Sequence, residues 1–257
     1  MSLSYINKSS YDSWKNYYWD YQYTLAKEYY IPLLKKWNFN LKNKKILDIG
    51  CGNGGFTAAF GNYSKIVGVD IKKFQWKKID NVEYKSYDIF KEPKEIDTDF
   101  DLIIMRDVIE HIPLDLKMDF IQKALEFTKD NAKLLITFPP FYSPFGLHQQ
   151  VLLKSFMRYI PFLSIISPKI LISVLRILNE KAKSINDIIE MHACKMTISN
   201  FEHIRQQLDL NISNSKFFFC RPSHEIRYNF KTNELKHNPI KYLKEFYILG
   251  TVYLINK

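Results

Sequence analysis

The chain has 257 residues, a formal net charge of +10 at pH 7, 46% hydrophobic side chains and 25% charged side chains. These proportions are ordinary for a soluble folded chain, and the length is sufficient for one substantial core. Three cysteines, Cys51, Cys194 and Cys220, lack the spacing of a metal site or a disulfide framework, so a reducing cytoplasm is expected. The first 20 residues are polar and aromatic, which argues against a signal peptide.

Lysine supplies most of the positive charge. Two clusters stand out: Lys42, Lys44 and Lys45, and Lys72, Lys73, Lys77 and Lys78. Such clusters can bind nucleic acid or anionic lipid. Because no nucleic-acid module accompanies them, a solvated lysine-rich surface is the favoured interpretation.

Residues 11–23 are crowded with aromatic side chains. Helical spacing would place Trp14, Tyr17, Tyr18 and Tyr21 on one face. We therefore expect amino-terminal helices in residues 1–44 that pack on a central sheet.

Residues 45–55 contain a short apolar strand, the carboxylate of Asp48 and then closely spaced glycines. Glycine tolerates a positive φ and has no Cβ, so the backbone can turn tightly beneath a ligand. The spacing G-x-G-x-x-G also fits a dinucleotide site, with Asp70 twenty residues beyond Gly50. A carboxylate at Asp48 would repel a pyrophosphate at the following helix, which favours a cationic nucleoside ligand such as S-adenosylmethionine.

Further strand-like segments follow in regular order. They are residues 66–70, 82–86, 100–106 and 134–138, with Asp88 after the second and Asp107-Val108-Ile109-Glu110-His111 after the third. Alternation with helix-like segments predicts βα units and a mainly parallel sheet. Ligands bind such sheets at the carboxyl ends of the strands.

With these residues, the chain resembles the class I S-adenosylmethionine-dependent methyltransferases, in particular the small-molecule branch with a strand-end acid and a Glu-His pair. The resemblance is clear over residues 40–140. It implies an α/β fold with a Rossmann-like, seven-stranded, mostly parallel sheet, helices on both faces and an antiparallel last strand. It also implies S-adenosyl-L-methionine as the cofactor.

The resemblance also assigns cofactor-binding roles. Asp48 would face the methionine end above the glycine loop, Asp70 would accept the ribose hydroxyls, and Ile71 would pack on adenine. Asp88 and Ile89 would contact the adenine edge. The complete implied set is Asp48, Gly50, Cys51, Gly52, Gly54, Asp70, Ile71, Asp88, Ile89, Arg106 and Asp107.

Residues 149–190 extend beyond a minimal fold of this kind. They contain two apolar stretches, 151–160 and 170–178, which charged residues, Pro161 and Pro168 make too short to span a bilayer. We expect two short helices that form a lid over the acceptor pocket, whereas a dimer interface and an interfacial membrane contact remain alternatives. The oligomeric state is left open.

The carboxyl-terminal part completes the predicted domain. Residues 199–202 have the pattern of a capping box that begins a helix, and residues 216–221 and 246–254 are predicted as the last strands. The whole chain is predicted as one methyltransferase domain, divided into helices at 1–44, a cofactor-binding core at 45–148, the helical insertion at 149–190 and the rest of the core at 191–257.

A hydroxyl acceptor must lose a proton, and histidine suits that role near neutral pH. His148, at the start of the insertion, and His111 are the candidate catalytic residues, and His192 is a weaker one. No metal site is expected. Phe138-Pro139-Pro140-Phe141 resembles the Asp/Asn-Pro-Pro-aromatic motif of methyltransferases that act on amino groups. It follows the fifth strand rather than the fourth, and Phe138 replaces the polar first residue of the motif. Methylation of a base or of a glutamine amide is therefore disfavoured.

These features predict O-methylation of a small molecule, partly apolar or sugar-containing. Two alternatives stay open. An RNA methyltransferase would use the lysine clusters and bind in a salt-dependent manner. A non-catalytic module with the same fold would bind the cofactor without turnover, or not bind it.

Overall fold

The computed structural model describes residues 2–91, 96–236 and 243–257, which contain one eight-stranded sheet in the order β3-β2-β1-β4-β5-β8-β6-β7. The strands are β1 (Lys45–Ile49), β2 (Lys65–Asp70), β3 (Val82–Ser86), β4 (Phe100–Arg106), β5 (Thr128–Phe138), β6 (Asn211–Cys220), β7 (Asn233–Glu234) and β8 (Gly250–Asn256). The first five strands pair in parallel, and β8 runs antiparallel between β5 and β6. The predicted fold class is confirmed; the strand count exceeds seven because the two-residue β7 pairs with β6.

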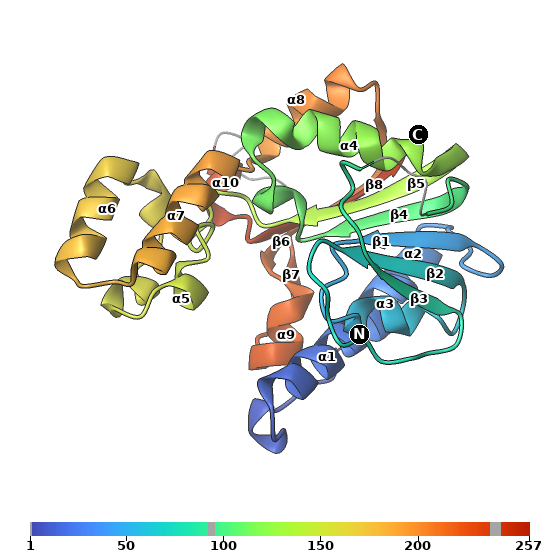
Figure 1. Ribbon diagram of the computed structural model, residues 1–257, viewed down its shortest axis with the longest axis horizontal. Coiled ribbons are helices and arrows are strands. Elements are labelled where there is room, and N and C mark those ends of the chain that lie inside the picture. Colours follow the sequence, from blue (N-terminus) through green and yellow to red (C-terminus); the bar gives the residue numbers. More distant parts are fainter. Residues whose placement is uncertain (1, 92–95, 237–242) are drawn as a thin grey trace.

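Helices cover both faces of the sheet (Figure 1). One face carries α1 (Trp14–Leu25), the π-helical turn η2 (Ala26–Tyr30), α2 (Ile31–Lys36) and α3 (Gly55–Phe60), and the other carries α4 (Lys117–Glu126) and α8 (Ile198–Gln207). Side chains alternate across a strand, so Leu47 joins the core beneath α4 and α8 while Ile46 joins the core beneath α1 to α3. This double burial explains why the strands read as nearly continuous apolar runs.

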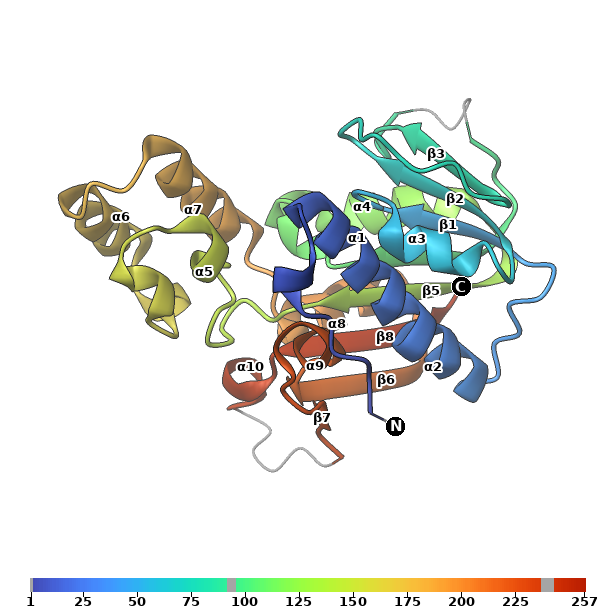
Figure 2. The same cartoon turned by 90° about the horizontal axis from the view of Figure 1, so that it is seen from below.

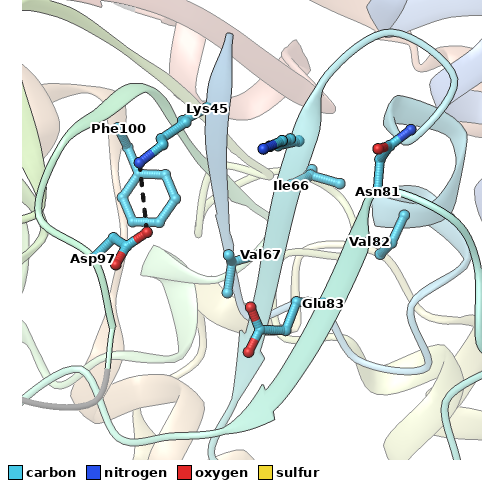
Figure 3. Close-up of a pocket in the computed structure, with 9 residues that line it drawn as sticks. Lys45, Ile66, Val67, Asn81, Val82, Glu83, Asp97 and Phe100 are labelled. Atoms are coloured by element: carbon cyan, nitrogen blue, oxygen red, sulfur yellow. Dashed lines mark ion pairs between the residues drawn. The ribbon is translucent and has the colours of Figure 1, made fainter. Parts of the chain in front are cut away.

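A surface pocket of about 310 Å³ lies at the amino ends of the strands. Its lining includes the first residues of four strands, Lys45, Lys65, Val82 and Phe100 (Figure 3). No helix is present in the described residues that connect β2 to β3 and β3 to β4. Because ligand sites in such folds lie at the opposite edge, this pocket is not the candidate cofactor site.

The insertion after β5 lies beyond one end of the sheet in both views (Figures 1 and 2). It comprises α5 (Gln149–Leu152), the 3₁₀ turns η6 (Phe156–Tyr159) and η7 (Leu163–Ile165), α6 (Pro168–Ile177) and α7 (Ala182–Cys194). The helix expected over 151–160 is wrong, because Leu153 is extended and separates α5 from η6. Among the described residues, no helix is both long and apolar enough to cross a membrane.

The insertion has its own hydrophobic core. Ten buried side chains form it: Phe141, Leu147, Leu153, Met157, Leu163, Leu171, Leu175, Ile185, Ile188 and Met191. The insertion therefore depends on internal packing as well as on the sheet.

Two carboxyl-terminal boundaries differ from the prediction. The cap of α8 is Thr197, whose hydroxyl accepts the amide of Asn200 at 2.9 Å, while the amide of Ser199 donates to Glu245. The last strand begins at Gly250 rather than at residue 246, because residues 244–247 form α10 (Lys244–Tyr247). The remaining short helix, α9 (Pro222–Tyr228), follows β6.

The contact between α1 and α3 gives a stability prediction. A Cβ on Gly55 would lie 2.3 Å from the carbonyl oxygen of Trp19, so Gly55→Ala must push α1 away from the glycine loop. We expect a loss of about 2 kcal/mol in urea unfolding, the cost of overpacking a close contact. The exposed control Lys36→Ala should change the free energy by less than about 0.5 kcal/mol. Equal effects of the two changes would contradict the packing described.

Candidate functional site

The glycine loop follows β1 and folds across the end of β2. Gly50, Gly52 and Gly54 have φ values of 77°, 53° and 82°, and the amides of Gly50 and Cys51 donate to the carbonyl of Val69. These conformations favour glycine. Nothing lies within 4 Å of a Cβ built on Gly52, so the loop leaves an open face above its backbone. That open cradle fits a ligand that approaches the main chain closely.

Asp48 lies beneath this loop with 2% of its surface exposed. The hydroxyl of Thr57 donates to its carboxylate at 2.6 Å. Burial raises the pKa of Asp48 to about 6, although Thr57 and Arg106 favour the charged form. A bound cation would offset the cost of that buried charge.

The acids that follow β2 and β3 lie at adjacent strand ends. Asp70 accepts the amides of Gly52 at 3.0 Å and Lys72 at 2.9 Å, which ties β2 to the glycine loop. Ile71 is 71% exposed, as an apolar surface for a planar ligand must be. The Asp88 carboxylate accepts the amide of Phe90, and within the described residues no hydrogen bond joins Asp88 to the glycine loop.

Two aromatic residues that were not predicted hold the loop from its outer side. The Trp76 indole donates to the carbonyl of Gly52 at 2.8 Å, and the Tyr84 hydroxyl donates to the carbonyl of Gly54 at 2.7 Å. The two rings are stacked, with centroids 5.5 Å apart. Neither residue belongs to a recognisable motif, so only their proximity in the fold reveals this role.

At the end of β4, Asp107 is held by two arginines. Arg221, which follows β6, donates to both carboxylate oxygens at 2.6 Å, and Arg106 donates to one of them at 3.2 Å. The Thr137 hydroxyl donates to the same carboxylate at 3.0 Å. Arg106 also donates to Gln22 of α1. Three separate segments of the chain therefore meet at one carboxylate, and Arg106 links α1 to them as a fourth.

This arrangement fixes the charge of Asp107. Burial alone would raise the pKa of Asp107, but Arg221 and Arg106 hold it well below its usual range. Arg221 could not be recognised from the sequence, because nothing near it in the chain marks a functional residue.

Beside Asp107, the 3₁₀ turn η4 (Ile109–His111) carries Glu110 and His111, and His148 begins α5 with a φ of 56°. The two imidazole centroids are 5.3 Å apart. The possible ligand atoms of Glu110, His111 and His148 all lie within 4.8 Å of one another, so this group could hold a metal ion. The two predicted catalytic histidines are thus brought together.

Burial dominates the acid–base properties of this group. It lowers the pKa of His148 to about 4 and lowers the pKa of His111, although Asp107 opposes both shifts. It raises the pKa of Glu110 well above its usual value. Both imidazoles are therefore neutral at pH 7.

A buried lysine holds the turn that carries Glu110 and His111. Lys117 is fully buried, and its ammonium donates to the carbonyls of Ile109 and Ile112. Burial lowers its pKa to about 8. Helix α7 of the insertion packs on the same turn, so the turn is fixed from two sides.

The other candidates lie elsewhere. His192 packs against Phe141 in the insertion, with ring centroids 5.3 Å apart, and is not part of the histidine pair. In the first lysine cluster, Lys44 pairs with Asp101 at 2.9 Å and Lys45 pairs with Asp99 at 2.8 Å. These ion pairs are consistent with an ordinary solvated surface.

The chain is similar in sequence to known proteins. The family model described as "Methyltransferase domain" matches residues 18–212. A curated relative, the mitochondrial ubiquinone biosynthesis O-methyltransferase of Bos taurus, is 32% identical over 109 residues, which cover 38% of this chain and 29% of that protein. The chain thus matches less than a third of that relative's length.

Solved structures share the fold. A SAM-dependent methyltransferase from Archaeoglobus fulgidus has a TM-score of 0.51 at 15% identity, with 90% of this chain and 94% of that chain covered. The magnesium protoporphyrin IX methyltransferase of Synechocystis has a TM-score of 0.51 at 11% identity, with 98% and 88% covered. At these identities the likeness extends to the fold alone.

The buried carboxylate of Asp48 predicts a pH-dependent effect of Asp48→Asn. Because the folded-state pKa is raised, the stability that Asp48 contributes is present at low pH and is lost as pH rises through about 6. The asparagine avoids this loss while keeping an acceptor for Thr57. We expect the variant to be more stable than wild type by about 1–3 kcal/mol at pH 8 and by less at pH 5, measured by urea unfolding. A difference that does not change with pH would contradict the buried charge.

The arginine pair predicts the opposite effect at Asp107. Asp107→Asn leaves the partly buried Arg106 and Arg221 without their carboxylate, so we expect a loss of about 3 kcal/mol in urea unfolding at pH 7. The control Glu202→Gln breaks an i,i+3 pair with Arg205 and should cost less than about 1 kcal/mol. A similar cost for both variants would show that the Asp107 network is not a buried structural element.

Proposed function

The chain belongs to the methyltransferase-domain family and is an S-adenosylmethionine-dependent methyltransferase, and from this premise we propose that it methylates a hydroxyl group of a small-molecule acceptor. The observation that carries the proposal is the pair of neutral histidines beside the end of β4, with centroids 5.3 Å apart. The O-methyltransferase name of the bovine relative supports a hydroxyl acceptor.

The strand ends supply the groups that this cofactor needs. Asp70 has carboxylate lone pairs left for ribose hydroxyls, and Ile71 offers an exposed apolar surface for adenine. Asp88 and Ile89 would complete the adenine side. At the other end, the methionine ammonium would lie near Asp48. The bound cofactor supplies a methyl group that is already activated for in-line displacement.

The protein must then align the acceptor and remove its proton. Alignment of reacting groups alone can contribute several kcal/mol to lowering a barrier. His111 is the better proton acceptor of the pair, because an imidazole whose pKa is about 4, as in His148, is a weak base. Asp107 favours the protonated form of His111 and so supports this assignment.

The insertion would provide the acceptor wall. Helix α7 packs on the turn that carries His111, and His148 begins the first helix of the insertion. An apolar segment beside this turn favours an acceptor with apolar parts. Exposed apolar side chains, among them Val151, Ile170 and Ile177, also lie on its outer surface.

A labelled-cofactor experiment tests the acceptor class. Purified protein is incubated with methyl-labelled S-adenosylmethionine and a cell extract that has been separated into small-molecule, RNA and protein fractions. We expect the label to appear in small molecules as an O-methyl group. His111→Asn should lower this transfer by about 100-fold, the contribution typical of a general base, with unchanged affinity for S-adenosylhomocysteine.

The same experiment separates the alternatives. The exposed variant His203→Asn is the matched control and should transfer methyl groups as the wild type does. Label confined to RNA or protein would overturn the small-molecule proposal. Tight binding of S-adenosylhomocysteine with no labelled product in any fraction would favour a binding module.

A further inference from the structure

We propose that Glu110, His111 and His148 form a binding site for one divalent transition-metal ion, with Zn²⁺ as the representative ion. The ligand atoms of the three side chains lie within 4.8 Å of one another. Sequence spacing gave no sign of this site, because His148 comes from the insertion whereas Glu110 and His111 come from the turn after β4. The proposal therefore departs from the expectation that the chain has no metal site.

The carboxylate of Glu110 is the strongest observation. Glu110 is 2% exposed, and neither of its carboxylate oxygens has a hydrogen-bond partner. Nε2 of His148 is likewise buried without a partner. A buried polar atom without a partner costs free energy, and an unpaired carboxylate costs more. One cation bound among these atoms would give a partner to both oxygens of Glu110 and to Nε2 of His148.

The charged side chains nearby do not serve as partners for the Glu110 carboxylate. The ammonium of Lys117 donates to the carbonyls of Ile109 and Ile112, and no carboxylate in the described residues pairs with it. Arg221 is occupied by both oxygens of Asp107. Asp107 is therefore committed to the arginines, while its negative charge still favours a cation close by.

The donor set selects the kind of ion. Two imidazole nitrogens and one carboxylate oxygen suit Zn²⁺, Mn²⁺, Fe²⁺ or Co²⁺, whereas Mg²⁺ and Ca²⁺ prefer oxygen ligands throughout. Neutral imidazole is the form of histidine that binds a metal ion. Ligands at about 2.1 Å from one ion lie roughly 3–3.5 Å apart, so no pair of these ligand atoms needs to approach by more than about 2 Å.

Three protein ligands leave at least one coordination position open. His111 is exposed, so that position can be reached from the acceptor side. This use of the ion rests on the proposed function: the acceptor hydroxyl would bind the ion, its pKa would fall, and its proton would pass to solvent before the oxygen attacks the methyl group. The histidines then act as ligands, and the ion promotes loss of the proton in place of His111, whose role as base applies to the protein without a bound ion.

Metal binding can be tested without knowing the acceptor. Tag-free protein is stripped with a chelator, and ZnCl₂ is titrated by calorimetry; Co²⁺ is added separately to record its visible absorption. We expect one ion per chain. Glu110→Gln and His148→Asn should each weaken Zn²⁺ binding by more than about tenfold, a loss that even outer-sphere changes can reach.

The control is His203→Asn, which removes an exposed histidine outside the group and should bind Zn²⁺ as the wild type does. Unchanged circular dichroism and S-adenosylhomocysteine affinity in each variant would show that it is folded. A stoichiometry near zero, or wild-type affinity in Glu110→Gln, would overturn the proposed site.

Failure of the proposed function and failure of the metal site give different experimental results. If Zn²⁺ binds in a Glu110-dependent manner while no small molecule is methylated, the metal site is supported and the proposed function fails. If the metal-free protein methylates its acceptor as fast as the Zn²⁺-loaded protein, activation of the hydroxyl by the ion is overturned.

Discussion

The contact on which the rest of the site depends is the carboxylate of Asp107 between two arginines. Arg106 belongs to the same strand end, but Arg221 follows β6 and is distant in the chain. Arg106 continues the connection to Gln22 of α1. A partly buried charge that is held by two arginines keeps its partners close, so the geometry of these segments is strongly constrained. The amino-terminal helix, the central strands and the carboxyl-terminal strands meet there.

Beside this network, the same edge of the sheet carries buried ionisable side chains that differ in their hydrogen bonding. Lys117 donates to main-chain carbonyls, and Asp48 accepts from Thr57. Among these buried ionisable groups, Glu110 alone has neither oxygen hydrogen-bonded within the described residues. The contrast distinguishes carboxylates that are hydrogen-bonded within the fold from one whose oxygens have no partner there.

Sequence reasoning predicted the strand and the glycine turn of residues 45–55 well, because both are local features. A strand, an acid and three glycines occupy one continuous run, and the alternation of elements predicted parallel pairing through β5. The contacts that join distant segments were not predicted. Trp76 and Tyr84 meet only when β3 lies beside β2, and Arg221 reaches Asp107 only after the last strands add to the sheet.

Boundary errors have physical causes as well. The predicted helix across 151–160 is interrupted because Leu153 is extended, which apolar periodicity alone does not reveal. Thr197 caps α8 in place of Ser199, whose amide and hydroxyl are taken by Glu245 of α10. The extended backbone at Leu153 therefore determines where α5 ends, and the contact of Ser199 with Glu245 accompanies the start of α8 at the Thr197 cap.

The separate interior of the insertion has an evolutionary consequence. Its ten core side chains pack mainly on one another, so substitutions there alter few residues of the sheet. Selection can thus change the interior of the insertion while the glycine loop and the neighbouring strand ends stay intact. Among descendants of this chain, sequence should diverge faster in the insertion than in the glycine loop.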